Sequence, residues 1–364
     1  MQASLLRTVC HDWHVAHGGR MVEFAGWTMP VQYSTITKEH NAVRDAAGLF
    51  DIAHMGRLRF TGPDACRFLD IIVTNDVTNL QVGQIRYALV TNSDGGILDD
   101  VLVYRFDGFY FLVVNASNRQ KIVSWIDQHR HSFDVDVEDL TFEQFMLALQ
   151  GPHAVAILKS LVDCEIDALR YYHSVQSSFL DAPALVSRNG YTGEIGFEVI
   201  VSVEIAQQFW ETLIDRGRSY GLLPAGLGCR DTLRLDAAMP LYGHELNESI
   251  DPFTAGLSFA VKLDAGDFIG KEALIVAREN KNRQRRIGLK LSGRRIAREG
   301  AILFVGDQQV GEVTSGTFSP TFERPIAMAY VKPAFTEPGT MLQVDIRGKR
   351  EQAIVVKLPF YRRQ

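Results

Sequence analysis

Several features that mark specialised proteins are missing from this sequence. No run of about 18 apolar residues is present, so we expect no membrane-spanning helix. The four cysteines form no CxxC pair, which argues against a cysteine-built metal site and a disulfide-rich secreted framework. The first residues also lack the continuous apolar core of a signal peptide. We therefore expect a cytoplasmic protein that is used from its first residues.

The sequence also lacks an excess of basic residues and the motifs of several enzyme classes. The formal net charge is -5 and basic residues gather only in short segments such as KNRQRRIGLK; since phosphate binding needs a basic face, nucleic acid is not an expected partner. No GxSxG, HExxH or P-loop is present, so serine, zinc and nucleotide-hydrolysing chemistry have no support. His11, His14 and His17 are three apart, but no ligand cluster accompanies them, and we expect no metal site.

Antiparallel hairpin signals organise much of the chain. VLVYRF and FYFLVV flank Asp107-Gly108, and ALVSR and YTGEIGFEVIV flank Asn189-Gly190; both pairs are typical of two-residue turns. A helix capped by Ser202 is expected through VEIAQQFWETLIDRG. Hairpins mixed with separate amphipathic helices predict an α+β fold rather than a doubly wound parallel sheet.

Short strands between turn signals take over from about residue 285. The segments RIGLKLSG, AILFVGDQQVGEVTSG, PIAMAYVK, MLQVDIRG and EQAIVVKL predict a small antiparallel β-barrel or sandwich. The charged segment at residues 277–286 is the expected linker. We place the domain boundary there, with one region at 1–280 and a second domain at 281–364.

Two adjacent carboxylates stand in an apolar strand at GGILDDVLVY. The pleat places Asp100 on the more apolar face and Asp99 on the face of Arg105. Asp99 is therefore expected to be solvated or paired, and Asp100 is the candidate for a carboxylate that is held for chemistry. The alternative is that Asp100 binds turn amides after Gly95-Gly96, and the pattern does not decide between the two.

Two further charged residues stand in unusual positions. Glu198 follows a glycine-punctuated stretch, and a carboxylate there can accept two parallel N–H bonds from an amidine-like edge such as that of a pterin or guanine ring. A surface glutamate on an edge strand is the alternative, and the residues alone favour it. Arg230 is expected in the first turn of a helix after Gly226 and Gly228, where a cation opposes the helix dipole. An anionic partner would explain it, and so would pairing with Asp231.

A series of blocks resembles the aminomethyltransferase, or T-protein, family of the glycine cleavage system. They follow the family's order over essentially the whole chain: HGGRMVEFAGWTMPVQY, DIAHMG, RYALVTNSDGGILDD, NGYTGEIGFE, GLGCRDTLRL, FIGKEAL, and VTSGTFSP with IAMAYV. The resemblance implies a three-domain cloverleaf around a central channel, in which two α+β parts form a folate site and a C-terminal antiparallel β-barrel follows. It also implies that the one-carbon unit of an aminomethyl group, carried on the lipoyl arm of the H-protein, is transferred to tetrahydrofolate.

The family's functional positions fall on particular residues of this chain. The second aspartate of GGxxDD falls on Asp100, which the resemblance makes the catalytic carboxylate. Positions of the folate pocket fall on Tyr87, Asn115, Tyr191, Glu198 and Arg230. Two residues depart from the pattern: Ala53 stands where serine usually precedes HMG, and Phe259 stands where tryptophan is frequent. We expect pocket shape or folate affinity to differ there, and the reaction class to be unchanged.

Two other interpretations use a similar fold. The C-terminal halves of sarcosine and dimethylglycine dehydrogenases capture one-carbon units, but they need an attached dinucleotide-binding half, of which this sequence shows no sign. A non-catalytic folate-binding helper of iron–sulfur assembly carries a KGCYxGQE-type motif, whereas this chain has PAGLGCRDTLRL. The aminomethyltransferase interpretation is therefore favoured.

Overall fold

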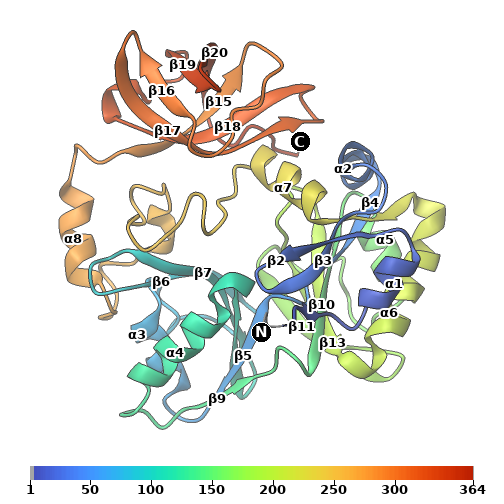
Figure 1. Cartoon of the computed structure of the whole chain (residues 1–364). Coiled ribbons are helices and arrows are strands. Elements are labelled where there is room, and N and C mark those ends of the chain that lie inside the picture. The colour runs from blue at the N-terminus through green and yellow to red at the C-terminus, as the bar shows by residue number, and fades with distance from the viewer. Residues whose placement is uncertain (1–3, 364) are drawn as a thin grey trace. The chain divides into compact units, whose positions relative to one another are not determined.

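The computed structural model describes residues 4–363, which form two compact units (Figure 1). The first unit contains the residues up to Leu69 together with Val77–Tyr87 and Val101–Asp231. The second contains Asp70–Asp76, Ala88–Asp100 and the residues from Thr232 onward. The helices, in chain order, are α1 (His11–Ala16), α2 (Ile36–Asp45), α3 (Ala65–Ile72), α4 (Arg119–His129), α5 (Ala154–Leu158), α6 (Val203–Gly217), α7 (Leu227–Asp236) and α8 (Lys271–Glu279).

A six-stranded sheet forms the centre of the first unit. Its strand order is β11 (His173–Phe179), β12 (Ala182–Arg188), β13 (Gly196–Ser202), β10 (Gln144–Gln150), β4 (Ala47–Asp51) and β14 (Leu222–Pro224). Helix α6 covers part of this sheet through its buried residues Phe209, Trp210 and Leu213. The predicted cap is confirmed, because the Ser202 side chain accepts a hydrogen bond from the Glu204 amide at 3.3 Å. The apolar period of the helix therefore positions it as the sequence predicts.

Two smaller sheets complete the N-terminal architecture. One has the order β1 (Leu6–Arg7), β3 (Trp27–Gln32), β2 (Arg20–Phe24). The other has the order β6 (Ile85–Thr91), β7 (Ile97–Phe106), β8 (Phe109–Val114), β5 (Gly56–Thr61), β9 (Asp136–Asp139). In the second sheet Phe106 pairs with Phe109 across Asp107-Gly108, and Gly108 has a φ of 79°. The first predicted hairpin is therefore confirmed, down to its two-residue turn.

The second predicted turn is wrong, although its two strands do pair. Strands β12 and β13 are antiparallel, with Ser187 opposite Glu198, but residues 189–195 connect them instead of a two-residue turn. Neither Asn189 nor Gly190 has the positive φ of such a turn. A Cβ on Gly190 would lie 2.0 Å from the side-chain oxygen of Gln150. The glycine is thus required for close packing rather than for a turn.

The second unit contains a closed β-barrel, drawn in orange and red in Figure 1. Its strands follow the order β15 (Arg285–Leu291), β18 (Arg324–Val331), β17 (Gln308–Ser319), β16 (Ile302–Val305), β19 (Met341–Ile346) and β20 (Lys349–Val356). All six pairs of neighbouring strands are antiparallel, and alternate residues fill the interior. The expected α+β class with a C-terminal antiparallel barrel is confirmed. The expected linker is partly wrong, because residues 277–279 belong to α8.

Four single-turn 3-10 segments connect these elements within the described residues: Ala116–Asn118, Arg218–Tyr220, Ser258–Ala260 and Pro333–Phe335. Across residues 4–363, no helix combines the length and apolar character that crossing a membrane requires.

Candidate functional site

Glu198 lies in the interior of the six-stranded sheet. Strand β13 is bonded to β12 on one side and to β10 on the other, so the alternative of an edge-strand surface glutamate is wrong. The side chain is 5% exposed, and its Oε2 accepts a hydrogen bond from Asn189 Nδ2 at 2.7 Å. A buried carboxylate is costly unless other groups compensate its charge. Its surroundings therefore indicate what it binds.

Arg230 is the positively charged residue that acts on Glu198, and it lies over the ring of Tyr191. Burial raises the pKa of Glu198, while Arg230 and the bond from Asn189 act in the opposite direction. Burial lowers the pKa of Arg230, and Glu198 opposes that shift. The guanidinium carbon lies 4.7 Å from the centroid of the Tyr191 ring, a cation–π distance. Since α7 begins at Leu227, Arg230 does lie in its first turn.

Three of the six residues predicted for the site therefore act on one another: Glu198, Arg230 and Tyr191. Two atoms of residues that act on Glu198 stand out, because Arg230 Nη1 and Asn189 Oδ1 are buried and have no hydrogen-bond partner among the described residues. Buried polar atoms without partners are rare in native proteins. A donor and an acceptor left open beside a carboxylate indicate a place for a polar ligand.

The loop that carries Asn189 and Tyr191 is held from two directions. Gln150 Nε2 donates to the Asn189 carbonyl at 3.1 Å, and Gln150 Oε1 accepts from Thr192 Oγ1 at 2.9 Å. Arg44 donates to the Thr192 carbonyl at 2.8 Å and forms an ion pair with Glu194 at 3.0 Å. These side chains are buried or nearly so. The loop is therefore a rigid part of the site rather than a mobile turn.

Asp100 is half-buried on β7, whereas Asp99 is fully buried. This corrects the expectation that Asp99 is solvated, whereas the other expectation, that Asp99 is paired, stays a prediction. The reason is that Ile97, Val101 and Val103 share the covered face with Asp99, and counting apolar residues on each face does not show which face the rest of the chain covers. The partial exposure of Asp100 is the property that a carboxylate acting on a ligand requires.

The turn before Asp100 satisfies its own amides. Asn92 Oδ1 accepts from the amides of Asp94 and Gly96 at 3.0 and 2.8 Å, and the Asn92 carbonyl accepts from Gly95 at 3.0 Å. Asn92 therefore binds the amides of Gly95 and Gly96, which the alternative interpretation assigned to Asp100.

The remaining predicted residues lie along the five-stranded sheet. Tyr87 is half-buried on β6, and Asn115 is half-buried directly after β8, with an extended backbone (φ -63°, ψ 141°). Their place in a folate pocket stays a prediction.

His54 is a buried residue that sequence reasoning missed. It is 3% exposed, and burial lowers its pKa to about 3, with Asp51 and Arg230 acting on it in opposite directions. The imidazole is therefore neutral, and its edge contacts the Phe24 ring at a centroid distance of 5.6 Å. The AHMG motif was its signal, but a single histidine flanked by apolar residues in the sequence gives no charge pattern to detect.

The two departures from the family pattern have different surroundings. The Ala53 amide donates to Asp51 Oδ1 at 2.8 Å, so the backbone at this position is fixed whatever side chain it carries. Asp51 also bonds His14 Nε2 at 2.9 Å, and His14 Nδ1 lies 2.8 Å from the Tyr33 hydroxyl. His14 is thus part of a buried hydrogen-bond network next to Ala53. Phe259, the second departure from the family pattern, is 61% exposed.

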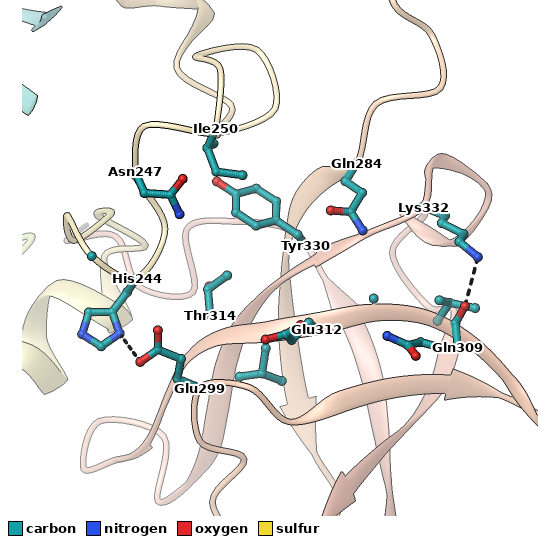
Figure 2. Close-up of a pocket in the computed structure, with 14 residues that line it drawn as sticks. His244, Asn247, Ile250, Gln284, Glu299, Gln309, Glu312, Thr314, Tyr330 and Lys332 are labelled. Carbon is teal, nitrogen blue, oxygen red and sulfur yellow. Dashed lines mark hydrogen bonds and ion pairs between the residues drawn. The ribbon is translucent and has the colours of Figure 1, made fainter. Parts of the chain in front are cut away.

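A separate cavity of about 510 Å³ lies against the barrel within the second unit (Figure 2). Its rim includes an ion pair between His244 and Glu299 at 2.9 Å and a hydrogen bond from Lys332 to the Gln309 carbonyl at 3.1 Å. None of the residues predicted for the site lines this cavity. It is therefore distinct from the group around Glu198.

Comparisons with known proteins agree along the chain. Residues 10–265 match the family described as "GCVT N-terminal domain", and residues 284–362 match "Glycine cleavage T-protein C-terminal barrel domain". The "Aminomethyltransferase" of Streptomyces avermitilis is 47% identical over 96% of this chain and 96% of its own, and that of Streptomyces coelicolor is 46% identical over 99% and 98%. The crystal structure of glycine cleavage system aminomethyltransferase T from Bartonella henselae matches with a TM-score of 0.92 at 35% identity, covering 98% of both chains. The chain therefore belongs to the glycine cleavage T-protein family.

Proposed function

We propose that this chain acts as the aminomethyltransferase of the glycine cleavage system. It transfers the one-carbon unit of an aminomethyl group, held as S–CH2–NH2 on the lipoyl arm of the H-protein, to tetrahydrofolate. The products are methylene-tetrahydrofolate, ammonia and dihydrolipoyl H-protein. The observation that carries the proposal is the buried Glu198 with Arg230 in a chain that matches the family over nearly its whole length.

The groups around Glu198 suit the pterin ring of tetrahydrofolate. The ring offers an amidine-like edge with parallel N–H donors and a carbonyl acceptor next to it. A carboxylate accepts two such N–H bonds, Arg230 Nη1 supplies an open donor, and Asn189 Oδ1 supplies an open acceptor. Each open atom of the protein thus has a complementary group on the ring.

Asp100 is proposed as the catalytic carboxylate. The carbon–nitrogen bond of S–CH2–NH2 breaks as N5 of the folate bonds to the carbon, and the proton of N5 leaves with the ammonia. The carbon–sulfur bond then breaks as N10 bonds to the same carbon, and the proton of N10 goes to the lipoyl sulfur, which restores the dihydrolipoyl arm. A fixed negative charge beside these nitrogens orients them and stabilises the positive charge that develops during capture. A half-buried carboxylate on a rigid strand can do both without accepting a proton itself.

The remaining parts of the proposal concern Tyr87 and Asn115, the partner and the setting. Tyr87 and Asn115 are assigned to the folate pocket on the family resemblance, the lipoylated H-protein is the partner, and the chain works in the cytoplasm. The domain division at 1–280 and 281–364 is proposed with them.

The function is tested by supplying aminomethyl-loaded H-protein and tetrahydrofolate to the purified protein. We expect methylene-tetrahydrofolate and ammonia to form in equal amounts and only when both substrates are present. Binding of tetrahydrofolate without any turnover would instead favour the folate-binding helper of iron–sulfur assembly.

Glu198→Gln is expected to weaken tetrahydrofolate binding by about tenfold to a hundredfold, since a charge-assisted bond is lost. Binding uses the ionised carboxylate, whose pKa burial raises. The affinity of the wild type should therefore fall as the pH drops through that raised pKa, whereas the affinity of the variant should not show this fall. Anaerobic calorimetric titrations at a series of pH values from pH 8 downward measure both effects.

The exposed Glu211 on α6 provides the matched control, because Glu211→Gln removes the same charge from the surface of the same unit. It should bind tetrahydrofolate like the wild type. Equal affinities for wild type and Glu198→Gln would exclude Glu198 from the folate site.

A further inference from the structure

Asn189 contacts the Glu198 carboxylate through one end of its amide. It is 3% exposed, and Nδ2 donates to Glu198 Oε2 at 2.7 Å and to the Tyr104 hydroxyl oxygen at 3.2 Å. An ionised carboxylate only accepts hydrogen bonds, so the amide nitrogen must be the end that faces Glu198. The amide oxygen is consequently turned away from the carboxylate.

The amide oxygen of Asn189 is an acceptor without a donor. It is buried, and no residue among 4–363 donates a hydrogen bond to it. Native proteins rarely retain such an atom unless a ligand or water supplies the missing partner. Arg230, which also acts on Glu198, shows the complementary case: its buried Nη1 is a donor that lacks an acceptor among the described residues.

Packing around Gln150 fixes the position of Asn189. The Gln150 side chain is fully buried and donates to the Asn189 backbone carbonyl at 3.1 Å. It occupies the space where Cβ atoms of Gly190 and Gly196 would stand, at 2.0 and 2.3 Å. Because the backbone is held in this way, a change of the side chain at position 189 leaves the loop anchored.

We propose that Asn189 is a specificity-determining residue of the folate site, whose amide nitrogen orients Glu198 and whose amide oxygen accepts a hydrogen bond from an N–H of the pterin ring. This inference rests on the proposed function, because it takes the ligand of Glu198 to be tetrahydrofolate. It selects ligands that carry a further N–H donor beside the amidine edge. A ring with an acceptor at that place would leave two acceptors facing each other.

Asn189→Asp tests the inference through its pH dependence. Two carboxylates 2.7 Å apart cannot both ionise readily, so at pH 8 we expect tetrahydrofolate to bind at least about tenfold more weakly. As the pH falls, the pair takes up one proton, and the new carboxyl group can then donate to Glu198 as the amide does. Affinity should therefore recover on acidification, opposite in sign to the wild type.

The other groups that act on Glu198 do not produce this reversal. Arg230 on α7 keeps its charge throughout this range, and burial raises the pKa of both Tyr104 on β7 and Tyr171 ahead of β11, so these phenols stay neutral. The reversed pH dependence of Asn189→Asp is therefore attributed to the new carboxyl group at position 189.

Asn189→Ser is the second variant, because it removes both ends of the amide and should bind tetrahydrofolate weakly at every pH. Asn282→Asp, at an exposed position, adds the same charge elsewhere and should behave like the wild type. Thermal unfolding of each variant establishes that it is folded. If Asn189→Asp and Asn189→Ser bind like the wild type while Glu198→Gln binds weakly, the inference is overturned and the proposed function stands. If Glu198→Gln also binds like the wild type, the assigned role of Glu198 fails together with the inference.

Discussion

Replacing Asp100 with asparagine is expected to lower turnover by about a hundredfold to a thousandfold, the usual cost of removing one preorganised electrostatic contact to a transition state. The amide keeps the size and half-buried position of the side chain on β7, so the fold and most of the tetrahydrofolate affinity should persist. The negative charge that stabilises the developing cation is lost. The measurement is the rate of methylene-tetrahydrofolate formation from saturating aminomethyl-loaded H-protein, with tetrahydrofolate affinity determined in parallel.

Asp107→Asn is the matched control for this experiment. Asp107 is exposed in the turn at the far end of the same strand, so the same chemical change there should leave turnover as in the wild type. Near-normal turnover by a folded Asp100→Asn protein would remove Asp100 from the mechanism. Loss of tetrahydrofolate binding together with turnover would show that Asp100 binds the folate rather than acting on the reacting carbon.

The largest expected loss of stability follows from Arg234→Met. Arg234 on α7 and Glu245 are 2% and 0% exposed and pair at 2.9 Å, and Arg234 also donates to Ser315 on β17 at 2.7 Å. Glu245 accepts further bonds from Thr314 at 2.5 Å and from the Leu241 amide at 3.0 Å. Removing one partner of a buried ion pair leaves the other charge uncompensated, which costs about 3–5 kcal/mol of unfolding free energy. The shift in the midpoint of urea denaturation measures this loss.

An exposed ion pair is the natural comparison for this variant. Arg218 and Asp215 pair at 3.1 Å with side chains that are 75% and 68% exposed, and surface pairs contribute about 0–1 kcal/mol. Arg218→Met should therefore shift the midpoint little. A similarly small shift for Arg234→Met would show that the second unit does not depend on the buried pair.

The stability that the Arg234–Glu245 pair contributes should depend on pH. Burial by itself would raise the pKa of Glu245, but Arg234 and Thr314 hold that pKa below its usual value. Stability from such a group is present above the unfolded-state pKa and is lost as the pH falls through the lower folded-state pKa. The difference in denaturation midpoint between wild type and Arg234→Met should accordingly narrow in acid.

Local signals predicted a large part of the fold. The turn at Asp107-Gly108, the helix capped by Ser202 and the strand-rich barrel each depend on neighbouring residues, and the structure contains all three. The turn at Asn189-Gly190 failed because its conformation depends on Gln150, 39 positions earlier in the chain. Packing between distant segments leaves no trace in a local pattern, whatever the quality of the turn signal.

The site was predicted less completely than the fold. Charged residues in unusual positions attract notice: Glu198 was found in a β-rich segment and Arg230 in the first turn of an expected helix, although the residues around Glu198 favoured an edge strand. The pleat separated Asp99 from Asp100 but did not show which face is covered. Asn189 and His54 were missed because both are neutral, and their importance comes from buried atoms that lack partners. The dense glycines of NGYTGEIG were the available sign that a side chain packs against the loop.

Close packing at Gly96 limits insertions and deletions in the GGILDD segment. A Cβ there would lie 1.8 Å from the Glu248 carbonyl oxygen, and the next amide, that of Ile97, donates to the carbonyls of Asn247 and Ile250 at 3.2 and 3.1 Å. The start of β7 is thereby locked in register against the segment 247–250. Inserting or deleting one residue after Gly96 would turn Asp100 to the opposite face of the strand. The length of this short segment should therefore tolerate less variation than the identity of its apolar residues.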